Sequence, residues 1–126
     1  MEEIGVFLVD SQALYREGVR IALSKEGDIE VVGEADDGED AIYQIEALSP
    51  DVVIVDFKLP SVDGPDVVRQ IKRHMPTLSV IMLSGYEDDE QLFNAIQVGA
   101  AGYLVKAASG QTLALQIRRV YQGEYP

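Results

Sequence analysis

Residues 51–65 read DVVIVDFKLPSVDGP, and this stretch decides the fold. It begins with an apolar run from Val52 to Val55 and then reaches an acid, Asp56. Because the run consists of Val and Ile with no polar residue at alternate positions, it predicts a strand covered on both faces, as in a parallel sheet. Pro65 suits the first turn of a following helix. The stretch therefore predicts a buried strand with a carboxylate at its carboxyl end.

Similar apolar runs occur on both sides of this stretch. They are Ile4–Val9, Val31 with Val32, Val80–Leu83 and Tyr103–Val105. Amphipathic segments follow each run, and Pro76 favours a stop after the third of them. Five strands alternating with five helices, (βα)5, predict an α/β fold with right-handed crossovers. This is a doubly wound five-stranded parallel sheet in a three-layer sandwich.

Helical spacing also predicts the side chains with which each helix packs on the sheet. The predicted faces are Leu14, Gly18, Ile21 and Ala22; Ala41, Ile45 and Leu48; Val67, Val68 and Ile71; Leu92, Ala95, Ile96 and Gly99; and Leu113, Ile117 and Val120.

The composition limits the function. The 126 residues suit one domain, and Lys+Arg 10 against Asp+Glu 22 give a net charge of −12. So acidic a chain is poorly suited to bind nucleic-acid backbones or anionic membranes by itself. It has no Cys and a single His, His74, which excludes disulfides, thiolate metal sites and two-His metal sites within one chain. The apolar run near the N-terminus is too short for a signal peptide or a membrane span, so we expect a cytoplasmic protein with no membrane partner.

Charged and polar residues follow four of the predicted strands. Asp10 and Ser11 follow the first, Asp56 the third, Ser84 the fourth and Lys106 the fifth. In open α/β sheets, ligands bind outside the carboxyl ends of the strands. Two carboxylates there favour a hard cation such as Mg²⁺, and a Lys with a hydroxyl suits the oxygens of a phosphoryl group. The set predicts a carboxylate that accepts a phosphoryl group from elsewhere, since the chain has no GxxxxGKS/T loop for ATP.

Several segments together resemble the receiver domain of two-component response regulators. They are VFLVDSQALYREGVRIAL (residues 6–23), PDVVIVDFKLPSVDGPDVVRQI (50–71), VIMLSGYEDDEQLFNAIQVGAAGYLVK (80–106) and a closing amphipathic helix. LYREGVRIAL and GAAGYLVK look most like the NarL/FixJ subfamily, whose members usually carry a C-terminal helix-turn-helix DNA-binding domain of the LuxR type. The resemblance implies a flavodoxin-like strand order, 2-1-3-4-5. It also implies that residues 1–126 are a receiver domain of a longer transcription regulator, which would bind DNA only through a C-terminal domain outside this chain.

The resemblance assigns the acids to a Mg²⁺ site. Asp56 matches the phosphoacceptor and a metal ligand, Asp10 matches the first of two metal-binding acids, and Lys58 matches the position whose backbone carbonyl reaches the metal. Ser11 stands where the family has the second acid, and its hydroxyl is a weaker, uncharged ligand. We expect Ser11 to be a weak or absent ligand, with weaker Mg²⁺ binding and slower phosphorylation. The alternative is that Asp10 coordinates the metal directly and little changes.

The resemblance also assigns the residues that respond to the phosphoryl group. Ser84 and Lys106 match the residues that bind it, and Tyr103 matches the aromatic side chain that swings inward once Ser84 is engaged. The implied partners are a sensor histidine kinase, which donates the phosphoryl group, and a second copy in a homodimer. Such a domain catalyses its own phosphorylation and dephosphorylation at most, and is otherwise not an enzyme.

Other functions fit less well. Ser11 also suits a degenerate receiver that acts without phosphorylation, as a dimerisation or interaction module. A haloacid-dehalogenase-type hydrolase needs a DxD-like pair after the first strand, which Asp10-Ser11-Gln12 lacks. A flavodoxin-like flavin binder is disfavoured because the acidic strand ends oppose a phosphate, and because the chain has no Trp and no hydroxyl-rich phosphate loop.

Overall fold

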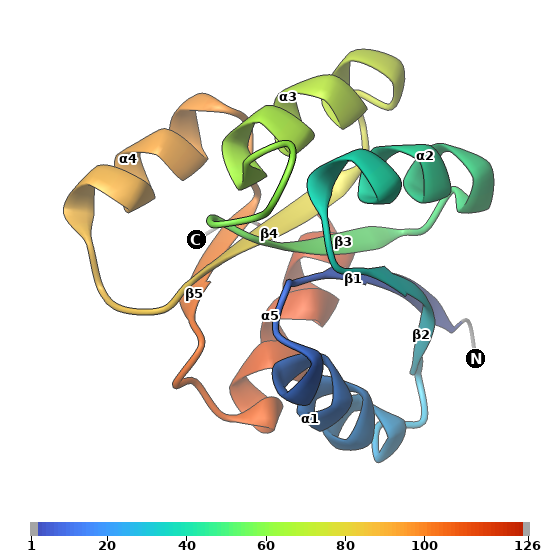
Figure 1. Cartoon of the computed structure of the whole chain (residues 1–126). Coiled ribbons are helices and arrows are strands. Elements are labelled where there is room, and N and C mark those ends of the chain that lie inside the picture. The colour runs from blue at the N-terminus through green and yellow to red at the C-terminus, as the bar shows by residue number, and fades with distance from the viewer. Residues whose placement is uncertain (1–2, 125–126) are drawn as a thin grey trace.

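A computed structural model describes residues 3–124 as a five-stranded parallel sheet with helices on both faces (Figure 1). The strands are β1 (Ile4–Val9), β2 (Ile29–Ala35), β3 (Val52–Asp56), β4 (Ser79–Ser84) and β5 (Gly102–Val105). The helices are α1 (Ala13–Ser24), α2 (Gly38–Leu48), α3 (Gly64–His74), α4 (Asp89–Gln97) and α5 (Gly110–Tyr121). The strand order is β2-β1-β3-β4-β5 with parallel pairing, so the predicted (βα)5 fold and its flavodoxin-like order are confirmed.

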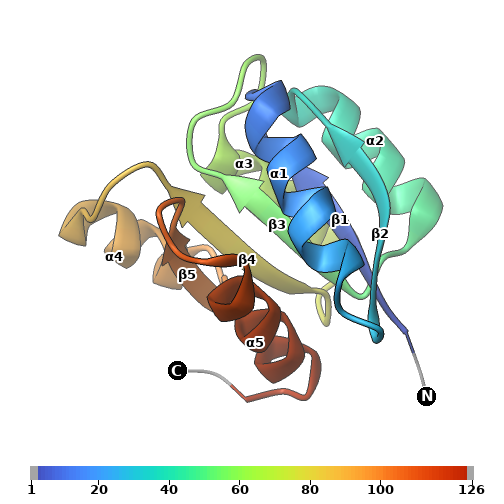
Figure 2. The same cartoon turned by 90° about the horizontal axis from the view of Figure 1, so that it is seen from below.

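The helices form two layers around the sheet. α1 and α5 lie side by side on one face, and α2, α3 and α4 cover the other (Figures 1 and 2). In β1, Val6 and Leu8 belong to the core on the α1–α5 side, whereas Phe7 and Val9 belong to the core on the opposite side. All four side chains are fully buried. Burial on both faces therefore explains why the central strands are apolar without a break.

The predicted face of α1 is wrong. The helix buries Val19 and Leu23, whereas Leu14 is 83% exposed and Ile21 is 55% exposed. The segment carries two apolar stripes, and the one formed by Leu14, Gly18 and Ile21 faces solvent. Helical periodicity finds both stripes but does not say which of them meets the sheet.

The predicted face of α4 is also wrong in part. Ala95 is buried, but Leu92 is 40% and Ile96 is 65% exposed. By contrast, the faces predicted for α3 and α5 are confirmed, since all their members are buried: Val67, Val68 and Ile71, and Leu113, Ile117 and Val120. In α2, Ala41 and Ile45 are buried and Leu48 is exposed.

Strand β2 is longer than the predicted pair Val31 and Val32. It runs from Ile29 to Ala35 at the edge of the sheet, where Glu30 is exposed. An edge strand is covered less completely than a central one, so polar residues interrupt its apolar pattern and hide its length in the sequence.

The strand order decides which residues meet at the carboxyl edge. β3 lies between β1 and β4, so the residues that end or follow these strands are neighbours. Asp10 directly follows β1, Asp56 ends β3 and Ser84 ends β4. Lys106 follows β5, and its backbone N–H donates to the Ser84 carbonyl at 2.8 Å. Four separate segments thus supply one site.

Candidate functional site at the carboxyl edge of the sheet

Two carboxylates share one ammonium at this edge. Lys106 Nζ lies 2.7 Å from Asp10 Oδ2 and 2.9 Å from Asp56 Oδ2. Asp10 is fully buried, Asp56 is 7% exposed and the Lys106 side chain is 15% exposed. Ion pairs that are so little exposed are screened weakly by salt. The structure therefore brings together three residues that the sequence places at separate strand ends.

Burial and charge perturb both members of the Asp56–Lys106 pair. Burial raises the pKa of Asp56, and the nearby charge of Asp10 adds to this, so that together they outweigh the hydrogen bond from Lys106. Burial lowers the pKa of Lys106, but its hydrogen bonds with Asp10 and Asp56 more than compensate and hold that pKa above 10.5. Lys106 is therefore a cation at neutral pH. With both acids ionised, two negative charges face one positive charge, which favours binding of a further cation.

Lys106 has two further neighbours that the sequence pattern did not predict. Its ammonium donates to Gln12 Oε1 at 2.6 Å and lies 4.7 Å from the centre of the Tyr15 ring. The backbone N–H of Gln12 donates to Asp10 Oδ1 at 2.8 Å, which fixes the start of the β1–α1 loop. The only hint of this contact in the sequence is that Gln12, two residues after Asp10, is polar. Its partner is 94 residues away in the chain, so only the fold shows the contact.

A cavity of about 260 Å³ opens onto Asp56, and Ser11 and Lys58 are among its lining residues. Mg²⁺ takes oxygen ligands, of which the protein usually supplies one or two carboxylates. The carboxylates of Asp10 and Asp56, the Lys58 carbonyl and the Ser11 hydroxyl are donors of that kind, so the residues present fit Mg²⁺. Within residues 3–124 no group of three acidic or His side chains gathers to hold a metal. The site offers two carboxylates rather than three.

Ser84 is buried beside this site, but its hydroxyl is engaged elsewhere. Ser84 Oγ donates to the backbone carbonyl of Tyr86 at 2.5 Å and accepts from the Tyr86 N–H at 3.3 Å. The two bonds close a tight turn at the start of the β4–α4 loop. In this structure Ser84 therefore holds its own loop rather than Asp56 or Lys106.

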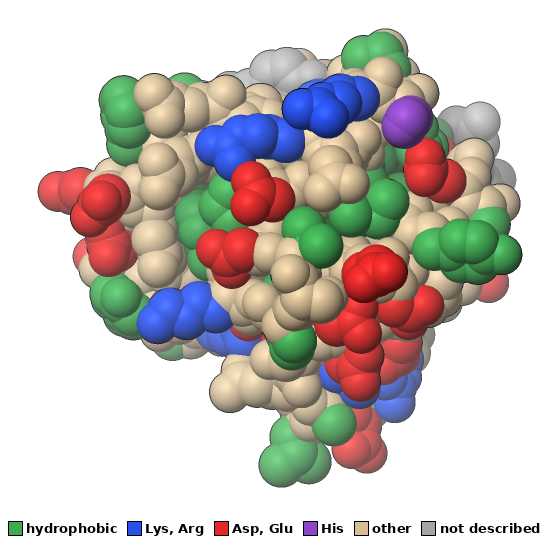
Figure 3. All heavy atoms as spheres, turned by 45° about the horizontal axis from the view of Figure 1, so that its top comes forward, with side chains coloured by type: hydrophobic (Ala, Val, Ile, Leu, Met, Phe, Trp, Pro, Cys, Tyr) green, Lys and Arg blue, Asp and Glu red, His purple; other side chains and the backbone are tan. Residues whose placement is uncertain are grey.

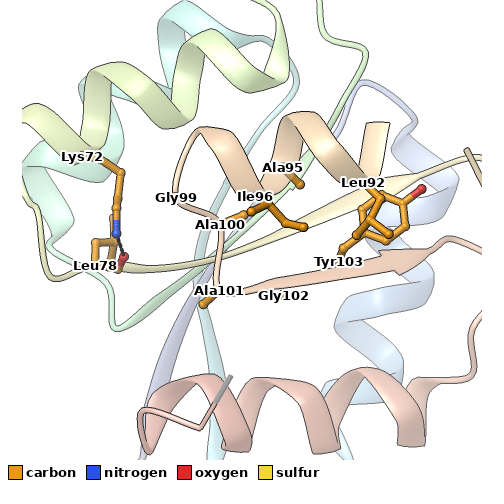
Figure 4. Close-up of a pocket in the computed structure, with 10 residues that line it drawn as sticks. All are labelled: Lys72, Leu78, Leu92, Ala95, Ile96, Gly99, Ala100, Ala101, Gly102 and Tyr103. Atoms are coloured by element: carbon orange, nitrogen blue, oxygen red, sulfur yellow. Dashed lines mark hydrogen bonds between the residues drawn. The ribbon is translucent and has the colours of Figure 1, made fainter. Parts of the chain in front are cut away.

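Tyr103 lies on β5, between Phe57 and a second hollow. Its ring meets the Phe57 ring edge-on, with 6.0 Å between ring centres and 73° between planes. Tyr103 also lines a hollow of about 540 Å³ beside α4, together with Leu92 and Ile96 (Figure 4). Because Phe57 follows Asp56 in the chain, Tyr103 connects the neighbourhood of the acid pair with the surface of α4.

Two glycines fix the loop that follows Asp56. A Cβ built on Gly64 would overlap the carbonyl oxygen of Asp56 and lie 2.8 Å from Phe57 Cα. At the start of α2, the Gly38 N–H donates to the Pro60 carbonyl at 3.1 Å. The β3–α3 loop is therefore packed backbone against backbone on both sides, which leaves the position of Asp56 little freedom.

The surface around the site is acidic. On the face that α2, α3 and α4 cover, acidic side chains gather in groups on both sides of the centre, while Lys and Arg lie in smaller separate groups (Figure 3). This agrees with the net charge of −12.

In the described part of the chain, every helix is too short or too polar to span a bilayer.

Comparison with known proteins gives one consistent result. Residues 6–118 match the response regulator receiver domain family. The chain is 35% identical over 121 residues to the response regulator protein VraR of Staphylococcus saprophyticus, a match that covers 96% of this chain and 58% of that protein. It is 33% identical to the transcriptional regulatory protein DegU of Brevibacillus brevis, over 96% of this chain and 51% of that protein. The chain therefore spans little more than half the length of these relatives.

A solved structure agrees with these matches. The signal receiver domain of the response regulator NarL from Mycobacterium tuberculosis superposes with a TM-score of 0.92 at 34% identity, covering 98% of this chain and 100% of that chain. The match extends over the whole sheet and therefore includes the edge that carries Asp10, Asp56 and Lys106. On the family match, these relatives and the shared fold, the chain belongs to the receiver domain family of response regulators and resembles its NarL/FixJ subfamily.

Proposed function

We propose that Asp56 accepts a phosphoryl group from a phosphohistidine on a sensor histidine kinase. The observation that carries this proposal is the Asp56 carboxylate at the mouth of a cavity, with the Lys106 ammonium 2.9 Å from its Oδ2. A carboxylate so placed is a nucleophile, and the ammonium is ready to neutralise phosphoryl oxygens. Membership of the receiver domain family supports the same role.

The transfer is an in-line displacement at phosphorus. A carboxylate oxygen of Asp56 forms a bond to phosphorus while the bond from phosphorus to the imidazole nitrogen of the kinase breaks. The electron pair of that bond stays on the imidazole, which takes up a proton. Lys106 then pairs with an oxygen of the new aspartyl phosphate, as it pairs with the carboxylate beforehand.

Asp10, Asp56 and the Lys58 carbonyl are the residues that would hold Mg²⁺, with Ser11 as a weak or absent ligand. When bound, Mg²⁺ supplies positive charge to the transferring phosphoryl oxygens. Asp10 is fully buried and fixed through its Oδ1 by the Gln12 N–H, so it is a rigid ligand. The missing acid at Ser11 leaves this Mg²⁺ site weaker than one with a second acid at that position.

Ser84 and Tyr103 would link phosphorylation of Asp56 to a rearrangement of the surface beside α4. When the Ser84 hydroxyl turns from Tyr86 to the phosphoryl group, the start of the β4–α4 loop loses two hydrogen bonds. Tyr103 lines the hollow beside α4, so its movement inward repacks that surface. The two arrangements form a two-state equilibrium that phosphorylation biases.

The whole protein would regulate transcription in the cytoplasm, through a C-terminal DNA-binding domain outside residues 1–126. The transcriptional regulator DegU shares this segment, and the acidic surface supports a separate DNA-contacting part. The exposed stripe Leu14, Gly18 and Ile21 on α1, next to a hollow between α1 and α5, would dock the kinase or a second copy of the chain. A receiver that works without phosphorylation is less well supported, because the acid pair and Lys106 remain in contact despite Ser11.

The test is labelling by acetyl phosphate in the presence of Mg²⁺, read as the mass gain of one phosphoryl group. The wild-type protein should gain it and the Asp56→Asn variant should not. Asp66→Asn is the matched control, because it makes the same change at an exposed acid of α3. Labelling that persists in Asp56→Asn would place the acceptor elsewhere, and an unlabelled wild type would favour the interaction module.

A further inference from the structure

The Lys106 ammonium contacts three oxygen atoms in this structure: it donates a hydrogen bond to Gln12 and forms ion pairs with Asp10 and Asp56. It lies within hydrogen-bonding distance of Asp10 Oδ2, Asp56 Oδ2 and Gln12 Oε1, at 2.7, 2.9 and 2.6 Å. The Tyr15 ring supports the same group through a cation–π contact at 4.7 Å. The two acids are part of the site already described, whereas Gln12 and Tyr15 have no role in it so far.

Gln12 and Tyr15 are well placed to restrain a flexible side chain. A Lys has a four-carbon stem, and its ammonium is held in one position only by its contacts. The backbone N–H of Gln12 is tied to Asp10 Oδ1 at 2.8 Å, and Tyr15 lies in the first turn of α1. Gln12 in the β1–α1 loop and Tyr15 in α1 therefore both contact the Lys106 ammonium, in addition to the two acids.

The three acceptors are not equivalent. The bonds to Asp10 and Asp56 join opposite charges, and such bonds are stronger than the bond to a neutral amide. Gln12 lines the cavity that opens onto Asp56, whereas Asp10 is fully buried. The Gln12 amide is thus the weakest of the three acceptors, and like Asp56 it lines the cavity from which a phosphoryl group arrives.

We propose that Gln12 and Tyr15 are positioning residues that act through Lys106. They hold its ammonium against Asp56 before phosphorylation, and Gln12 releases one N–H of Lys106 to a phosphoryl oxygen afterwards. This inference rests on the proposed roles of Asp56 and Lys106. It assigns to Gln12 and Tyr15, next to Ser11 in place of an acid, the task of holding the Lys106 ammonium.

The first test is the order of the Lys106 side chain in the unphosphorylated protein, measured by ¹³C relaxation of its ε-methylene group. Gln12→Met keeps the length of the side chain and removes the acceptor, so Lys106 should become mobile. Gln12→Glu keeps an acceptor oxygen, so Lys106 should stay ordered. Tyr15→Phe, which keeps the ring, should leave the order unchanged, whereas Tyr15→Leu should lower it. Unchanged order in both Gln12→Met and Tyr15→Leu overturns the proposal.

The second test is the rate of labelling by acetyl phosphate with Mg²⁺. Gln12→Met should slow labelling about five-fold, the usual net effect of losing one ordinary exposed hydrogen bond. Gln12→Glu should slow it too, although Lys106 stays ordered, because the added carboxylate keeps the N–H and repels the phosphoryl group. Gln12 is exposed and its side chain does not cap α1, so the free energy of unfolding of these variants in urea should differ from the wild type by no more than the one bond to Lys106.

A double-mutant cycle separates this inference from the proposed function. In a Lys106→Met background, Gln12→Met should have no further effect on the labelling rate. An equal slowing in both backgrounds means that Gln12 does not act through Lys106, and refutes the inference alone. If Lys106→Met labels as fast as the wild type, the role of Lys106 in the proposed function fails instead. If that background labels too slowly to measure, the Lys106 order parameter decides.

Discussion

The Ser11→Asp variant should bind Mg²⁺ more tightly than the wild type. In this chain the candidate metal site has two carboxylates, Asp10 and Asp56, and both already share the Lys106 ammonium. Ser11 lies directly beside Asp10 in the chain and lines the same cavity as Asp56. A carboxylate at this position adds one negative charge where the cation binds.

The exposure of Ser11 sets the size of the effect. Because the side chain is exposed, the added charge acts through a medium close to water. A divalent cation and a carboxylate about 4 Å apart attract each other by ~2 kcal/mol at a dielectric constant of ~80. At about 1.4 kcal/mol per factor of ten, this is a decrease in Kd of roughly 30-fold. A buried position would give a larger gain, so a much stronger effect would mean that the Ser11 site is drier than the structure shows.

Calorimetric titration with Mg²⁺ measures this change directly, and the Mg²⁺-dependent rise in thermal stability gives a second value through linkage. Ser24→Asp is the matched control, because it adds the same charge at an exposed position at the far end of α1. Its Kd should equal that of the wild type. Equal Kd values for the wild type and Ser11→Asp would refute the reasoning, and would mean that Asp10 and Asp56 alone determine the affinity.

Three further variants test the scaffold. Gly64→Ala should lower the free energy of unfolding by about 1–3 kcal/mol, the usual cost of overpacking, and should slow labelling, because its Cβ displaces the Asp56 carbonyl. Gly18→Ala, in α1, should instead raise the free energy of unfolding by about 0.5–1 kcal/mol, because nothing lies within 4 Å of the added Cβ. If urea unfolding shows Gly64→Ala to be more stable than Gly18→Ala, the packing described for Gly64 is wrong. Burial raises the pKa of Glu34, but hydrogen bonds from Arg16 and Arg20 lower it more, so its pKa in the folded protein is below 4.5. Ionised Glu34 therefore stabilises the fold above that pH, and the contribution is lost as the pH falls through the folded-state pKa. Glu34→Gln should lower the free energy of unfolding by about 1 kcal/mol at neutral pH and leave it unchanged at the most acidic pH, as measured by urea unfolding at a series of pH values. A difference between the variant and the wild type that stays constant with pH would exclude this ionic contribution.

The strands were predictable from the sequence where the sheet is covered on both faces. Val52–Val55 and Val80–Leu83 lie in central strands, and burial on both sides demands an apolar residue at every position. β2 was predicted only in part, because an edge strand admits polar residues such as Glu30. The interrupted pattern of β2 thus reflects its incomplete cover.

Part of the candidate site could also be predicted. Asp10, Asp56 and Lys106 follow apolar strands, and the parallel topology then brings them to one edge. Gln12 and Tyr15 could not be predicted as partners of Lys106, because their contacts depend on where α1 starts relative to β5. No local pattern in the sequence says how the start of α1 is placed relative to the end of β5.

The wrong prediction for α4 follows from a property that suits this helix to switching. α4 buries one residue, Ala95, whereas α3 buries four, Gly64, Val67, Val68 and Ile71. Each apolar Å² removed from water contributes about 25 cal/mol, so rearranging α4 costs less than rearranging α3. α4 follows the loop in which Ser84 bonds Tyr86, and it packs beside β5, which carries Tyr103. A change at Asp56 that releases Ser84 would therefore act first on the least anchored helix, whose apolar residues Leu92 and Ile96 are exposed.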